Sequence, residues 1–68
     1  MMINKDLDKA VDLHRKGQLV KAENIYLEIL SADKNNSYVL QLLGTLYLQK
    51  KDFKLSEEYL LNSLKYDP

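Results

Sequence analysis

The sequence contains no cysteine and no tryptophan, and it has a single histidine and a single proline. Without cysteine the chain can form neither a disulfide nor a thiolate metal site, and one histidine cannot hold a metal ion unaided. We therefore expect no metal and no cofactor. Packing alone must stabilise the fold, although a chain of this length buries only about 60% of the surface that its unfolded form exposes.

A net charge is also absent, because ten basic side chains balance ten acidic ones. The chain thus lacks the basic surface that is typical of nucleic-acid-binding proteins. It also lacks the charge that draws polybasic proteins to anionic membranes. We expect neither a nucleic acid nor a membrane as a partner.

Long apolar runs are missing as well. Residues 1–6 become charged without first forming an apolar core of signal-peptide length. The most apolar stretch, residues 38–48, is interrupted by Gln41, Gly44 and Thr45. It falls short of the roughly 20 apolar residues that a membrane-spanning helix needs. The sequence therefore predicts a cytoplasmic protein.

Apolar residues recur at spacings of three and four along most of the chain, the pattern of amphipathic helices. Helices are predicted at about residues 3–16, from Leu19 to the polar loop at 33–37, from there to the polar turn at 50–52, and at about 53–66. Gly17 suits a left-handed helix end, and Asn36 or Ser37 can cap the third helix. The short connections favour antiparallel neighbours, so we expect an all-α fold.

An offset of 34 residues relates the two halves of the chain. The pairs that match in residue class or turn position are Ala10 and Gly44, Leu13 and Tyr47, Gly17 and Lys51, Leu19 and Phe53, Ala22 and Ser56, Tyr26 and Leu60, Leu30 and Leu64, and Asp33 and Asp67. Lys16 and Lys50, Glu23 and Glu57, and Leu27 and Leu61 are identical pairs at the same offset. Such a period is typical of solenoid units that stack to bury their apolar faces. We expect two antiparallel helical hairpins in one domain, at about residues 3–36 and 37–68.

The second hairpin resembles a tetratricopeptide repeat. The residues that match the pattern of this family are Leu40, Leu43, Gly44, Tyr47, Ser56, Leu60, Ser63 and Pro68. The first hairpin matches in its second helix, through Gly17, Leu19, Ala22, Tyr26 and Leu30. The resemblance implies that the four helices stack as a short right-handed α-solenoid. Gly44 is costly inside a helix, so its expected purpose is to let a neighbouring helix approach closely.

The first helix departs from the family pattern. Asp6 and Lys9 stand where the family has large apolar residues. The first helix of a solenoid has no preceding unit to cover it, so we expect these charged residues to face water as an N-terminal cap. At the other end, Leu60 and Leu64 are expected to form an open apolar surface.

In this family the first helices of the hairpins line a concave groove that binds peptides or partner helices. By that resemblance the groove residues are Leu7, Val11, His14, Tyr38, Gln41, Leu42, Thr45, Leu48 and Gln49. An exposed apolar stripe of this kind is typical of an interaction surface. The alternative is that a rotated first helix brings Leu7, Val11 and Leu48 into the core. The Lys and Asn of the family's carboxylate clamp are replaced here by apolar residues.

No catalytic residue is predicted. His14 has neither an orienting acid nor a nucleophile fixed beside it, so we expect a packing role. Tyr26 and Tyr47 are expected to pack inside the hairpins with their hydroxyls in water. The carboxylates of residues 57–58 and the lysines of residues 50–54 are interpreted as solvated helix faces and helix ends.

The expected function is therefore that of a non-enzymatic scaffold that binds a protein or peptide. Two alternatives stay open. Residues 13–19 resemble the start of bacterial repeat arrays that are fused to glycosyl-, sulfo- or methyltransferases, so the chain can be the N-terminal segment of a larger enzyme. The apolar end of the second hairpin can also support a homodimer.

Overall fold

The computed structural model describes residues 2–66, with side chains described from Lys5 onward. It contains the helices α1 (Met2–Arg15), α2 (Leu19–Ala32), α3 (Ser37–Gln49) and α4 (Phe53–Tyr66), and no strand lies within this range. The predicted all-α fold is confirmed. The side chain of Ile3, together with Asp67 and the closing Pro68 of the repeat pattern, lies outside the described residues.

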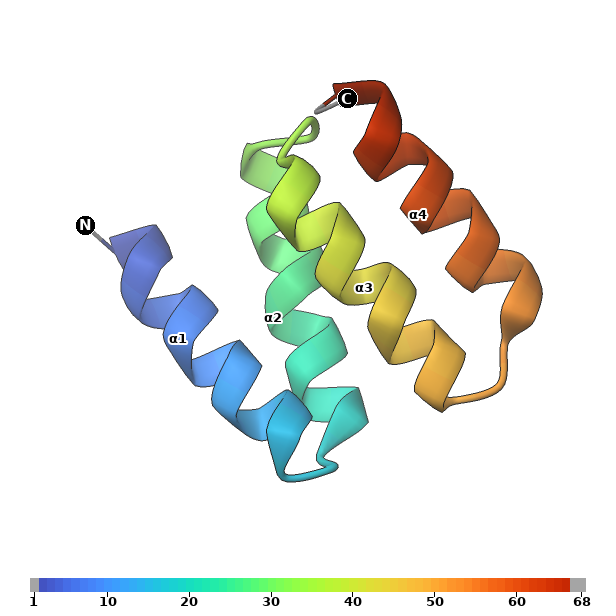
Figure 1. The fold of residues 1–68 in the computed structure, drawn as a ribbon. Coiled ribbons are helices and arrows are strands. Elements are labelled where there is room, and N and C mark those ends of the chain that lie inside the picture. Colours follow the sequence, from blue (N-terminus) through green and yellow to red (C-terminus); the bar gives the residue numbers. More distant parts are fainter. Residues whose placement is uncertain (1, 67–68) are drawn as a thin grey trace.

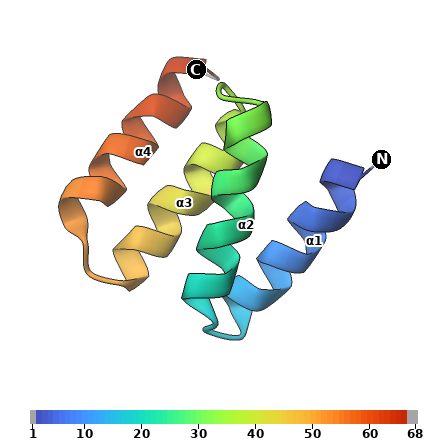
Figure 2. The ribbon, with the colours of Figure 1, turned by 180° about the vertical axis from the view of Figure 1, so that it is seen from behind.

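The helices lie side by side in chain order, and each runs antiparallel to the one before it (Figures 1 and 2). The central pair, α2 and α3, packs together and joins the two hairpins, with α1 and α4 on the outside. This is the predicted stack of two helical hairpins. The right-handed superhelix implied by the family resemblance stays a prediction.

The turns that close the two hairpins have the same geometry. In the first, Gly17 has a φ of 82°, and the amides of Gly17 and Gln18 donate to the carbonyls of His14 and Leu13. In the second, 34 residues later, Lys51 has a φ of 64°, and its amide donates to the carbonyl of Leu48. These bonds satisfy carbonyls that a helix end leaves free. The repeat therefore extends to the backbone, although a lysine occupies the position that suits glycine.

The third helix begins at a side-chain cap. The Asn36 carboxamide oxygen accepts a hydrogen bond from the Val39 amide at 3.1 Å. Of the two candidates for this cap, Asn36 is thus the one used. Asp52 receives the Leu55 amide at 3.3 Å in the same way before α4.

The core lies where the two hairpins meet. Its buried members are Ala10, Ala22, Tyr26, Ile29, Val39, Leu43, Leu46 and Tyr47. Gly44 provides the predicted close approach, because a Cβ at this position would lie 2.6 Å from the Leu60 side chain. The Ser56 hydroxyl uses the same proximity to donate to the Gly44 carbonyl at 2.8 Å.

Candidate protein-interaction site

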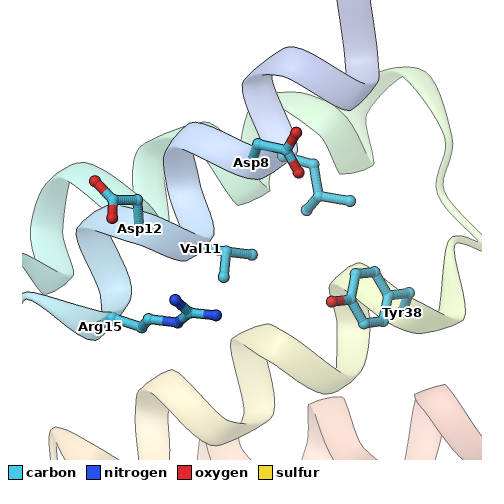
Figure 3. A pocket seen from close by; sticks show the side chains of 6 residues that line it. Asp8, Val11, Asp12, Arg15 and Tyr38 are labelled. Carbon is cyan, nitrogen blue, oxygen red and sulfur yellow. The ribbon is translucent and has the colours of Figure 1, made fainter.

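A hollow of about 390 Å³ separates α1 from the start of α3. It is lined by Leu7, Asp8, Val11, Asp12 and Arg15 of α1 and by Tyr38 of α3. In Figure 3 the Tyr38 ring lies across the hollow from Val11 and Arg15. Two helices that are distant in sequence therefore form its opposite walls. We call this hollow, together with the exposed face of α3 beside it, the α1/α3 groove.

The predicted groove residues differ in exposure. Tyr38 is 54% exposed and Leu48 is 51% exposed. Gln41, Thr45 and Gln49 are also exposed, whereas Leu7, Val11 and Leu42 are half-buried. Leu7 and Leu42 pack in part against the core. Leu48 therefore lies at the surface, and Leu7 contributes both to the core and to the wall of the groove.

One predicted residue faces a different hollow. Gln41 lines a second hollow with Leu60, Ser63 and Leu64 of α4. The nine residues predicted from the sequence therefore do not form one continuous lining. Only Leu7, Val11 and Tyr38 among them line the hollow between α1 and α3.

His14 is buried beneath the groove, with 8% of its surface exposed. Its Nδ1 lies 3.0 Å from the Tyr26 hydroxyl, and its Nε2 lies 2.7 Å from Oε1 of Gln49. Because an amide oxygen only accepts, Nε2 is assigned as the donor to Gln49, and in the neutral ring Nδ1 then accepts from Tyr26. The imidazole thereby connects α1, α2 and α3.

The expectation that the Tyr26 and Tyr47 hydroxyls face water is wrong. Tyr26 is fully buried, and burial together with nearby Tyr38 raises its pKa to about 12. A buried hydroxyl needs a partner, and His14 supplies it. Sequence reasoning missed this bond because its two residues come from different helices and form no motif.

Tyr47 takes part in a second bridge between the hairpins. Its hydroxyl donates to the Glu23 carboxylate at 2.6 Å, and the Lys50 ammonium lies 3.2 Å from the other oxygen of that carboxylate. The hydrogen bond from Tyr47 and the charge of Lys50 lower the pKa of Glu23 despite its partial burial. Burial and the same carboxylate raise the pKa of Tyr47. This cluster fixes the C-terminal end of α3 on α2.

In the range with described side chains, no group of three or more His, Cys, Asp or Glu residues could hold a metal ion. None of the four helices in residues 2–66 has the length and apolar character to cross a membrane.

No protein-family model matches the sequence, and no solved structure matches it either. A curated protein does. The chain is similar to the BBSome complex member BBS4 from Bos taurus, with 42% identity over 53 residues. The match covers 78% of this chain but only 10% of that protein. A stretch of this length necessarily includes parts of both hairpins.

Proposed function

We propose that this chain is a tetratricopeptide-type helical repeat that binds a protein partner in the α1/α3 groove, as a non-enzymatic scaffold of the cytoplasm. The observation that carries the proposal is the exposed face of α3. This helix of 13 residues has no charged side chain, and Tyr38 and Leu48 are each about half exposed on it.

Such a face is suited to a partner helix. A solvated helix face normally carries charged and polar residues, whereas the α3 face presents Tyr38, Leu42, Thr45 and Gln49 at spacings of four, three and four. Helical ligands dock apolar anchors at matching spacings. The half-buried Leu7 and Val11 of α1 add apolar surface on the facing wall.

The hollow also supplies polar contacts. Asp8, Asp12 and Arg15 line the hollow, and Asp12 also pairs with exposed Lys16 at 3.0 Å. Many protein interfaces combine apolar contacts with polar and charged ones in this way. The similarity to a member of a multiprotein complex supports a partner of the same class, a protein.

A selection experiment tests the proposal. A library of helical peptides is selected against the full chain, and the Kd of a selected peptide is measured by fluorescence anisotropy. We expect Val11→Lys to weaken binding by about tenfold or more, because it replaces one of the apolar side chains that line the hollow with an ammonium group.

The matched control is Val20→Lys. Val20 is 65% exposed on α2 and lies outside the groove, so this variant should bind the selected peptide as the parent does. Circular dichroism checks that both variants remain folded. Equal affinities of the parent and Val11→Lys would contradict the proposal.

A further inference from the structure

The second hollow, of about 340 Å³, lies between α3 and α4. Its lining residues are Gln41, Leu60, Ser63 and Leu64. Leu64 is 61% exposed. We call these four lining residues, together with Glu57, the α4 end face. Glu57 lies one helical turn before Leu60 and Leu61.

The 34-residue repeat relates this surface to a packed surface of the first hairpin. Moving back 34 residues, the four lining residues become Leu7, Tyr26, Ile29 and Leu30. In the first hairpin these positions are buried or partly buried in the core that α3 completes with Val39, Leu43 and Leu46. The surface that is open in the second hairpin is therefore an occupied interface in the first.

The same comparison applies to a charged residue. Glu23 accepts the Tyr47 hydroxyl and pairs with Lys50, and both partners are supplied by α3 and its C-cap. Glu57 occupies the equivalent position in α4 and is exposed, and within the described side chains nothing bonds to its carboxylate. The second hairpin thus carries the acidic half of the bridge without its basic half.

We propose that the α4 end face docks a partner helix with the chemistry of α3. Such a helix presents aliphatic side chains at the spacing of Val39, Leu43 and Leu46. It ends in a tyrosine followed three residues later by a lysine, as at Tyr47 and Lys50, and these two side chains bind Glu57. The aliphatic residues provide buried apolar area, and the bridge to Glu57 fixes the register of the helix.

A second copy of the chain is a poor occupant. The segment equivalent to α3 is α1, which holds Lys5, Lys9 and Asp12 in place of the three aliphatic residues and Leu13 in place of the tyrosine. Docking α1 on the α4 end face would bury charges without partners, which is strongly unfavourable. The chain's own α3 is already engaged with α2.

The test uses a fluorescently labelled peptide with the sequence of residues 36–51, which contains the cap, α3 and the lysine, titrated with the full chain. We expect binding to the parent and binding at least about tenfold weaker to Glu57→Lys, because like charges then face each other. A peptide carrying Lys50→Glu should recover affinity for the Glu57→Lys chain. Glu58→Lys makes the same charge change one residue away and should alter affinity less than about twofold.

Three results would overturn the proposal. The first is no binding at about 1 mM chain, and the second is equal binding to the parent and Glu57→Lys. In the second case, a dependence on Glu23→Gln would show that the peptide exchanges with the chain's own α3. The third is self-association of the parent in sedimentation that Glu57→Lys abolishes, which would make a second copy the occupant.

Discussion

The environment of His14 illustrates how single residues determine the packing of this small fold. The imidazole lies where α1, α2 and α3 meet, and both of its nitrogens are engaged. The hydrogen bonds of such a buried ring stabilise the fold chiefly because a buried donor or acceptor without a partner costs free energy. The helices are therefore positioned by polar contacts as well as by apolar area.

Tyr26→Phe is expected to lower the free energy of unfolding by about 1 kcal/mol, because it removes the donor to Nδ1 of buried His14. Urea denaturation followed by circular dichroism measures the change. Tyr66→Phe removes a hydroxyl from an exposed ring and is the matched control, with a change near zero. Equal loss in both variants would show that the buried hydroxyl bond contributes nothing specific.

The lowered pKa of Glu23 leads us to expect that the fold loses stability in acid. Its folded-state pKa lies below its ordinary value, so its contribution is complete above the unfolded-state pKa and disappears as the pH falls through the folded-state pKa. The urea midpoint of unfolding is measured at neutral pH and at about pH 3. The difference between these two midpoints should be smaller in Glu23→Gln than in the parent. Glu57→Gln makes the same change on an unbonded carboxylate and should keep the parental pH dependence. A parental dependence in Glu23→Gln would contradict this assignment.

At the scale of the helices, the hairpin turns provide a reciprocal test. Lys51 adopts a left-handed conformation that costs an L-residue roughly 1 kcal/mol, whereas glycine adopts it freely. Lys51→Gly should therefore raise the free energy of unfolding by about 1 kcal/mol. Gly17→Lys should lower it by a similar amount, because a Cβ at residue 17 meets no atom within 4 Å and only the backbone strain remains. Thermal unfolding of both variants measures the two shifts, and shifts of the same sign would be inconsistent with the repeated turn.

The helices themselves were predictable from local features of the sequence. Apolar spacing, the cap at Asn36 and the glycine at residue 17 specified the ends of the helices, and Gly44 specified a close helix contact. The bridges of His14 with Tyr26 and of Glu23 with Tyr47 were not predictable. Each depends on how helices from different parts of the chain are rotated about their axes, which only the assembled packing determines.

The sequence predicted the exposed groove residues of α3 more accurately than those of α1. Tyr38 and Leu48 are exposed as expected, since α3 has more apolar residues than its packed face can bury. His14 was also placed among the groove residues, but it lies below the surface and positions Gln49 instead. Leu7 serves both core and wall, a division that apolar spacing alone does not show.

As a whole molecule, the chain has two unlike ends. The expected exposure of Asp6 and Lys9 on α1 is confirmed, whereas α4 presents Leu61 and Leu64 at the opposite end of the row of helices. The α1/α3 groove is a third surface. An arrangement with separate apolar surfaces on one small helical stack is consistent with a scaffold that contacts more than one segment of its partners.

Binding of a partner helix in the α1/α3 groove is tested most directly by locating the bound peptide on the chain. Amide chemical shifts of the labelled chain are recorded during titration with the peptide selected against the parent. If the peptide binds in the groove, we expect the largest shifts on α1 and α3, at Val11, Tyr38 and Leu48, with little change at Val20 and Leu27 on α2. Shifts concentrated on α2, or spread evenly over all four helices, would contradict it.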